Sequence, residues 1–123
     1  NSMPTQKIES YRDLIVWQKS ISLVVMVYTV TKKFPPDEMF GLISQMRRAA
    51  VSIPSNIAEG KYRYSTKEFL HFLRIAYASG AELETQIEIS RQLFHTCTDD
   101  LNQTQAHLSE IMKMLNTLIR KLS

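Results

Sequence analysis

RRAAVSIPSNIAEG, residues 47–60, is the stretch that decides the fold of this chain. Its apolar residues recur at steps of three and four, which is the spacing of one face of an α-helix. Most of the other residues are small, so a neighbouring helix can approach closely. Pro54 interrupts the pattern, because its ring removes one backbone hydrogen bond and clashes with the carbonyl group of Ala50. We therefore predict a helix that is kinked or split at Pro54, with tight helix packing that offsets a cost of about 3 kcal/mol.

On both sides of this stretch, apolar residues recur at helical spacing along the chain, and residues that break helices are few. It contains only three glycines and four prolines. Helices are predicted over residues 11–33, 37–60, 66–95 and 99–122, within one domain that spans residues 3–123. Because long helices with short connections pack side by side, we predict an all-α, up-down-up-down four-helix bundle.

The ends of these helices are predicted from residues with known capping preferences. Ser10 and Ser65 are expected to cap the first and third helices, and residues 65–68 match a capping box. Pro36 suits the first turn of the second helix, and Gly60 is expected to cap its carboxyl end. Thr98 is the expected N-cap of the fourth helix.

Two helices have surfaces that indicate close neighbours. The first helix carries one apolar face with Leu14, Trp17, Ile21, Val24, Val25 and Tyr28, and a second with Val16, Leu23, Val27 and Val30. Together they cover roughly 220°, whereas an outer helix usually shows a stripe of about 100°. The surplus face predicts contact with another subunit. In the third helix the apolar seam narrows at Ala76 and Gly80, where a facing helix can approach most closely.

The composition is that of an ordinary soluble protein. Of 123 residues, 44% are hydrophobic and 22% are charged, and the net charge of +3 permits an anionic partner without requiring one. The single cysteine, Cys97, excludes an intrachain disulfide and predicts a structural thiol in a reducing compartment. No apolar run reaches the ~18 residues of a membrane span, so we expect a cytoplasmic protein with no membrane partner. Asn1 and Ser2, ahead of Met3, resemble the remnant of an expression tag.

Catalytic and cofactor-binding patterns are absent from the sequence. A di-iron bundle needs two Glu-x-x-His motifs, and only Glu68 with His71 has this form. Glu84 and Glu88 lie one helical turn apart with Arg91 after them, which is typical of a solvated charged face. There is no glycine-rich phosphate loop and no Gly-x-Ser-x-Gly turn. We therefore predict a non-enzymatic protein without a metal or a cofactor.

The basic residues are more organised than this net charge suggests. Cations alternate with tyrosines between the second and third predicted helices, and further cations share one face of the third. Such an array can hold phosphates while tyrosine rings stack on bases. The candidate nucleic-acid-binding residues are Arg47, Arg48, Lys61, Tyr62, Arg63, Tyr64, Lys67 and Arg74. One end of the bundle is thus expected to be positive, and the middle of the third helix negative. The alternative is that the tyrosines cover the bundle end and the cations are merely solvated.

Residues 45–60 resemble the signature of the four-helix-bundle proteins known as 23S rRNA intervening sequence proteins. The resemblance extends to residues 11–19, 67–70 and 80–86, and it covers nearly the whole chain. It implies a bacterial four-helix bundle that assembles into a homopentamer with a central channel and has no known catalytic activity. Members are encoded in insertions within rRNA genes or elsewhere in bacterial genomes. More distantly, the chain is similar to the accessory variability protein of diversity-generating retroelements, a basic pentamer that works with a reverse transcriptase and RNA.

Two hypotheses follow from the basic residues and the resemblance. The first is an oligomeric accessory or scaffold protein that binds RNA or DNA. Its further partners are copies of itself, and a reverse transcriptase or another protein. The second is a structural or protein-interaction module that binds no nucleic acid. The sequence leaves both open.

Overall fold

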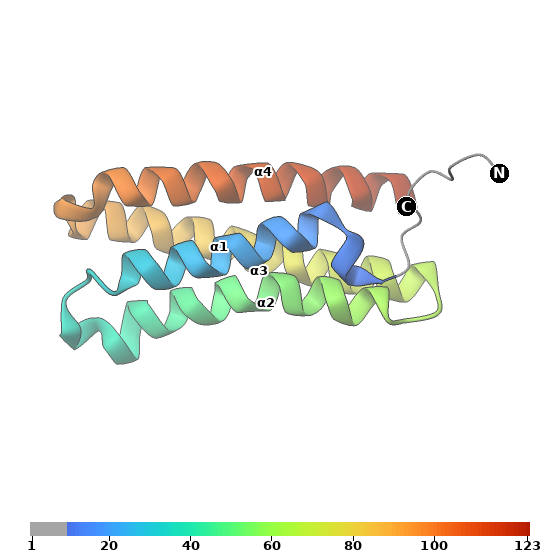
Figure 1. The fold of residues 1–123 in the computed structure, drawn as a ribbon, viewed down its shortest axis with the longest axis horizontal. Helices are drawn as coiled ribbons and strands as arrows, with labels where there is room; N and C mark the ends of the chain where they lie inside the picture. The colour runs from blue at the N-terminus through green and yellow to red at the C-terminus, as the bar shows by residue number, and fades with distance from the viewer. Residues whose placement is uncertain (1–9) are drawn as a thin grey trace.

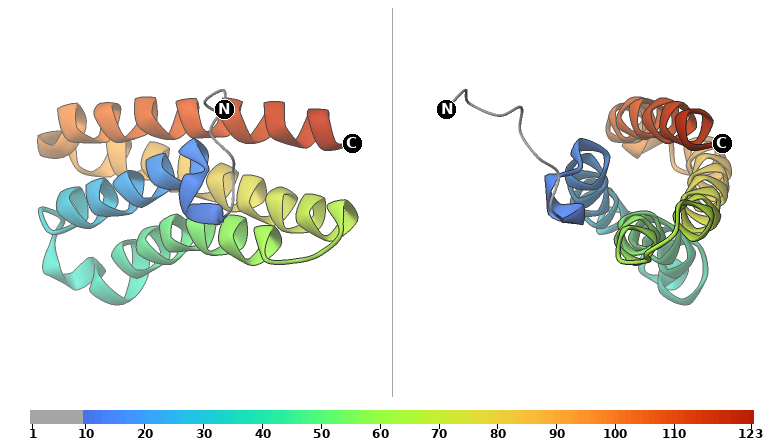
Figure 2. Two further views of the ribbon diagram at one scale, coloured as in Figure 1. Left: turned by 45° about the vertical axis from the view of Figure 1, so that its right-hand side comes forward. Right: turned by 90° about the vertical axis from the view of Figure 1, so that its right-hand side faces the viewer.

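The computed structural model describes residues 10–123, and the expected tag remnant, Asn1 and Ser2, lies outside them. The described chain forms four long helices and no strand, which confirms the predicted all-α fold (Figure 1). The helices are α1 (Ile15–Thr31), α2 (Ser44–Lys61), α3 (Thr66–Leu93) and α4 (Thr98–Leu122). They lie side by side around a common core and alternate in direction along the chain (Figure 2). None of these helices is long and apolar enough to cross a membrane.

The first helix begins four residues later than predicted. Ser10 does act as a cap, because its Oγ accepts a hydrogen bond from the backbone N–H of Arg12 at 3.1 Å. What it caps is the short 3-10 turn η1 (Tyr11–Asp13). Leu14 then adopts an extended conformation, with φ −76° and ψ 122°, and separates η1 from α1. Ser10 is therefore a cap, as predicted, but of a turn that precedes α1, whose own N-cap is Leu14, and the predicted helix boundary is wrong.

The second helix also begins later than predicted, at Ser44. Pro36 starts the 3-10 turn η2 (Pro36–Glu38), which is followed by the π-helical turn η3 (Met39–Ile43). Within η3 the backbone of Gly41, at φ −110° and ψ −109°, leaves the helical region, so one continuous helix cannot run from residue 37. By contrast, α2 passes through Pro54 without being split. Pro54 is buried, in keeping with the predicted tight packing.

Gly60 does not cap α2, contrary to the prediction. The helix continues to Lys61, and no glycine in the described chain has a positive φ. Gly60 is instead buried against α3, where a Cβ atom would lie 2.7 Å from Cβ of Phe72 and 3.2 Å from the carbonyl oxygen of Phe69. Its function is to let the two helix backbones approach closely.

The core follows the predicted apolar seam of α3 and one face of α4. Leu73, Ala76, Gly80, Leu83, Ile87 and Ser90 of α3 are buried, as are Leu101, Thr104, Leu108, Ile111 and Leu115 of α4. At the narrow part of the seam, a Cβ on Gly80 would lie 2.2 Å from Sδ of Met112, so a methionine tail fills this notch. The turn η4 (His95–Cys97) links α3 to α4, and Cys97, not Thr98, is the N-cap residue of α4. The thiol of Cys97 is buried, as predicted.

The two apolar faces of α1 differ in burial. The face with Val16, Leu23, Val27 and Val30 lies in the core. On the other face, Ile21 is 41% exposed, Val25 61% and Tyr28 39%. Within the described chain no element covers these three side chains, and the predicted contact of this face with another subunit stays a prediction.

Candidate nucleic-acid interface

The turn between α2 and α3 presents its tyrosines to solvent. Tyr62 is 75% exposed and Tyr64 is fully exposed. The turn is fixed where α3 begins, because Oγ of Ser65 accepts a hydrogen bond from the backbone N–H of Glu68 at 3.1 Å. Tyr64 thus does not cover the bundle end, which was the alternative for these rings. Lys61 is half-buried, with its Nζ 5.7 Å from the centre of the Phe69 ring, and Lys67 is exposed.

Arg63 lies in the same turn but its charge is already balanced. Its Nη2 donates to Oε2 of Glu59 at 2.6 Å, and its Nη1 lies 3.8 Å from Oε1 of Glu68. The guanidinium carbon is also 5.0 Å from the centre of the Phe72 ring. An arginine held in this way contributes less to attracting a phosphate than an unpaired lysine does.

The structure does not bring all eight candidate residues together. Arg47 and Arg48 lie in the first turns of α2, about 20 Å along the helix from Lys61. Nε of Arg47 donates to Oγ1 of Thr31 at 3.0 Å, and its guanidinium carbon lies 4.5 Å from the centre of the Tyr28 ring. Arg47 therefore ties α2 to α1 near the opposite end of the bundle. The other six candidates lie at or near the α2–α3 turn.

Four basic residues that sequence reasoning did not select belong to the same end of the bundle. They are Arg12, Lys113, Arg120 and Lys121. The start of the described chain and the end of α4 both lie beside the α2–α3 turn (Figure 1). Tyr11 contacts Tyr62 with ring centres 5.9 Å apart, and Nη2 of Arg74 lies 3.4 Å from Oγ of Ser123. The up-down-up-down topology alone implies this juxtaposition, so it could have been found from the sequence.

The charges of the described residues divide unevenly along the bundle. Around the α2–α3 turn lie Arg12, Lys61, Arg63, Lys67, Arg74, Lys113, Arg120 and Lys121, against Asp13, Glu59 and Glu68. We call these eight basic residues the basic end, and the formal charge of this half is +5. The opposite half holds Lys32, Lys33, Arg47, Arg48 and Arg91, against Asp37, Glu38, Glu82, Glu84, Glu88, Asp99 and Asp100, a formal charge of −2. Lys19 and Glu110, near the middle, pair with each other at 2.8 Å.

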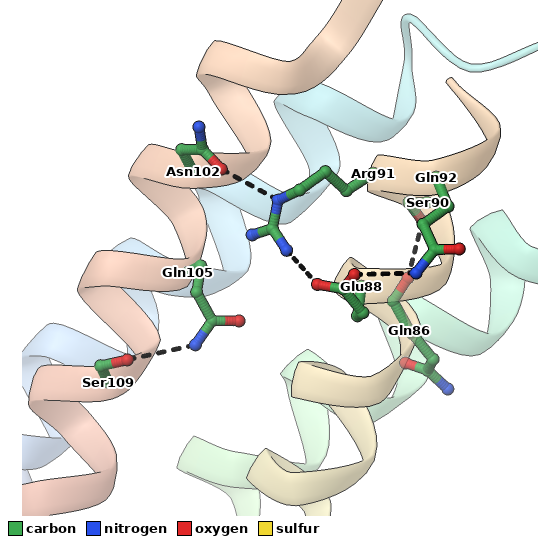
Figure 3. A network of polar contacts seen from close by, with 8 residues as sticks. All are labelled: Gln86, Glu88, Ser90, Arg91, Gln92, Asn102, Gln105 and Ser109. Atoms are coloured by element: carbon green, nitrogen blue, oxygen red, sulfur yellow. Dashed lines mark hydrogen bonds and ion pairs between the residues drawn. The ribbon is translucent and has the colours of Figure 1, made fainter. Parts of the chain in front are cut away.

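Acidic residues of the second half of α3 are engaged in surface contacts. Glu88 forms an ion pair with Arg91, whose Nε donates to Oδ1 of Asn102 on α4 at 2.9 Å (Figure 3). The hydrogen bond that Gln92 donates lowers the pKa of Glu88, and the charge of Arg91 lowers it further. The predicted solvated charged face is therefore confirmed at Glu88.

The residues considered as metal ligands are dispersed. His71 is exposed, and its ring lies against Phe72 with centres 5.2 Å apart. Glu68 is occupied by the α2–α3 turn, where Oγ of Ser65 donates to its Oε2 at 3.2 Å. Within residues 10–123 there is no group of three or more histidine, cysteine or acidic side chains that could hold a metal ion.

Comparisons with known proteins identify the family. One solved structure with a similar fold is described as a protein with unknown function from the S23 ribosomal protein family of Bacteroides thetaiotaomicron VPI-5482. It has a TM-score of 0.79 and 24% sequence identity, covering 86% of this chain and 96% of the other. No curated protein matches the chain. Residues 12–117 match the sequence profile of the 23S rRNA-intervening sequence proteins. Because the match spans most of the sequence, the chain belongs to the 23S rRNA-intervening sequence protein family.

Proposed function

We propose that this protein is a non-enzymatic, oligomeric accessory protein that binds nucleic acid through its basic end. The observation that carries this proposal is the uneven charge, with +5 around the α2–α3 turn against −2 in the opposite half. A modest net charge of +3 is thereby concentrated on one end of a narrow bundle. Phosphate groups are the natural counter-charge for lysines and arginines gathered in this way.

The availability of these cations supports the proposal. Among the basic-end residues only Arg63 forms an ion pair within the described chain. The charges of the other basic-end residues on α2, α3 and α4 are therefore available to a ligand: Lys61, Lys67, Arg74, Lys113, Arg120 and Lys121. Each cation that neutralises a phosphate releases a counterion, which makes binding depend steeply on salt. In an oligomer the basic end is repeated, and simultaneous contacts raise the affinity beyond that of one subunit.

Self-association is proposed through the outer side of α1 and α2. A hollow there is lined by Trp17, Ile21, Val24, Val51, Pro54 and neighbouring residues. It meets a second hollow at Val51, which extends to Tyr28, Met39 and Phe40. Phe40 is 98% exposed and Val25 61%. Ser44, Arg47, Arg48 and Ser52 also line the second hollow. Exposed apolar side chains in this number are nevertheless unusual on a monomer, so we expect a second copy of the chain to cover them.

Nucleic-acid binding is tested by titrating labelled RNA and DNA at several salt concentrations. Lys67→Glu, at the basic end, is compared with Lys32→Glu, which makes the same change of charge at the opposite end. We expect Lys67→Glu to weaken binding about tenfold at low salt and to reduce the salt slope by about 1, whereas Lys32→Glu has little effect. No binding at low salt, or equal losses in both variants, contradicts the proposal.

Self-association is tested by light scattering of the unmodified chain and of Ile21→Glu, since Ile21 lines the first hollow and is 41% exposed. We expect a mass that is a multiple of 14.2 kDa for the unmodified chain, and dissociation on Ile21→Glu. Ile89→Glu, on α3, is the control, because Ile89 is 45% exposed but lies away from the hollows. A monomer at micromolar concentration for the unmodified chain contradicts this part of the proposal.

A second candidate is a protein-interaction module without nucleic-acid binding. It is favoured if self-association leaves Phe40 uncovered, because this ring is 98% exposed at the edge of an apolar hollow. Intact oligomers that bind no RNA or DNA at low salt, together with a protein partner that is lost on Phe40→Ser, would select this candidate.

A further inference from the structure

The surface around the α2–α3 turn contains a hollow of about 580 Å³. Three tyrosines line it: Tyr11, Tyr62 and Tyr64. Tyr62 is 75% exposed and Tyr64 is fully exposed, so much of both rings is open to a ligand although Tyr62 contacts Tyr11. The volume lies within the range of small-molecule sites, which is roughly 300–1,000 Å³, and is large enough for one nucleoside.

The charged groups in the hollow decide which part of a nucleotide it suits. Glu59 and Glu68 both line it, and both approach Arg63, at 2.6 Å and 3.8 Å. One guanidinium between two carboxylates leaves the hollow itself with a net negative charge. A phosphate is therefore repelled from its interior, whereas a neutral base is accepted. Lys61 and Lys67 flank the turn and are free of ion pairs in the described chain, so they suit the phosphates on either side.

We propose that this hollow binds an unpaired base of a single-stranded nucleic acid, with Tyr62 and Tyr64 stacking on the base. This inference rests on the proposed function, and it specifies the form of nucleic acid. In a duplex the bases are stacked on one another and their faces cannot reach protein rings, whereas single strands offer them. Duplexes reach only the lysines and arginines of the basic end.

The two carboxylates add a preference among bases. A carboxylate accepts hydrogen bonds and donates none, so it pairs with the exocyclic amino group of cytosine. Thymine and uracil carry a carbonyl oxygen at the same position, which a carboxylate repels. The hollow is therefore expected to favour cytosine over thymine, two bases of similar size.

The test is a set of anisotropy titrations at one salt concentration, using the full chain and a labelled 12-nucleotide mixed-sequence single strand or its duplex. We expect the single strand to bind about tenfold more tightly than the duplex. Tyr64→Ala should lose most of this difference and leave duplex binding unchanged, whereas Tyr64→Phe keeps it. Tyr77→Ala, which removes a 37% exposed tyrosine from the middle of α3, should change neither affinity. Oligo-dC should bind several-fold more tightly than oligo-dT.

The outcomes separate this inference from the function on which it rests. Equal affinity for single strand and duplex, or an unchanged single-strand affinity in Tyr64→Ala, overturns the base site while phosphate binding at the basic end stands. Absence of binding to every nucleic acid overturns both. Because Tyr64 is fully exposed, its substitution should not affect folding, and unchanged thermal melting checks this.

Discussion

Between α2 and α3 the main chains meet at Gly60, whereas α4 meets its neighbours through side chains. A Cβ on Gly60 would lie 2.7 Å from Cβ of Phe72, 3.0 Å from the Phe69 ring and 3.2 Å from the carbonyl oxygen of Phe69. The Cβ of Phe72 and the carbonyl oxygen cannot move without moving α3. On α4, Met112 fills the notch at Gly80, and Nε2 of His107 lies 2.9 Å from the carbonyl oxygen of Lys19 on α1. Apart from Tyr11 of η1, the tyrosine hollow lies on a pair of helices with a fixed spacing, as does much of the basic end, and α4 packs against that pair adjustably.

Gly60→Ala should have the largest effect on stability. Alanine favours a helix over glycine by about 1 kcal/mol, but a Cβ 2.7 Å from Cβ of Phe72 forces the helices apart. Overpacking of a rigid contact costs up to about 3 kcal/mol, so we expect a net loss of about 2 kcal/mol in the free energy of unfolding. Urea denaturation at a fixed protein concentration measures it, since self-association makes stability depend on concentration. A variant as stable as the unmodified chain would show that this contact is not rigid.

His107→Ala should have the next largest effect. It removes the hydrogen-bonding contact between α4 and the α1 backbone, which is worth about 1 kcal/mol. His95→Ala is the matched control, because His95 is exposed and its side chain makes no hydrogen bond in the described chain, so its substitution should change stability by less than about 0.5 kcal/mol. Equal losses of stability in both variants would mean that the hydrogen bond between His107 and the α1 backbone does not help to hold α4.

Gly80→Ala should hardly change the free energy of unfolding, although its added Cβ would lie closer to a neighbouring atom than the Cβ of Gly60→Ala does. The obstructing atom is Sδ of Met112, at 2.2 Å, and a flexible thioether can rotate away. Its repacking cost of about 1 kcal/mol is offset by a similar gain in helix propensity. In a Met112→Ala background the clash is absent, so Gly80→Ala should then stabilise by about 1 kcal/mol. Urea denaturation of the unmodified chain, the two single variants and the double variant tests this. A loss for Gly80→Ala as large as that for Gly60→Ala would mean that the two interfaces are equally rigid.

The same distinction explains which parts of the fold could be predicted from sequence. The apolar seam of α3 depends on residue spacing alone, and its burial confirms the prediction. The prediction that Gly60 caps α2 is wrong because a glycine near a helix end is typical of a cap. Only the position of Phe72 reveals that the backbones of α2 and α3 approach closely at Gly60. α1 and α2 begin later than predicted, because Leu14 and Gly41 depart from helical geometry, which residue spacing does not reveal.

The candidate site could be predicted in part for a related reason. Residues 61–67 are neighbours in sequence and stay neighbours in space. Arg47 and Arg48 were grouped with them by sequence alone, although a helix carries them about 20 Å away. The pairing of Arg63 with Glu59 was detectable, since the two residues are four apart on the sequence. The hollow beside Tyr11 was not, because it depends on where η1 returns to the α2–α3 turn.

Glu110 offers the smallest effect and a separate test of the polar contacts between α1 and α4. The hydrogen bond from Lys19, at 2.8 Å, lowers the pKa of Glu110 below its ordinary value of 4.5, and the charge of Lys19 lowers it further. A carboxylate with a lowered pKa stabilises the folded chain above its unfolded pKa, and this contribution is lost as the pH falls through the folded pKa. Glu110→Gln should therefore lower the melting temperature slightly at pH 7 and have no effect at pH values well below 4.

Two changes of condition sharpen this last prediction. Because the pair is exposed, added salt should reduce the difference in melting temperature at pH 7. In a Lys19→Gln background most of the pH-dependent difference should disappear, since its main cause is gone. A difference that persists at acidic pH, or that survives Lys19→Gln unchanged, would mean that Glu110 acts through packing against α1. The contact between α1 and α4 would then resemble the packed interface of α2 and α3 more closely than the comparison proposes.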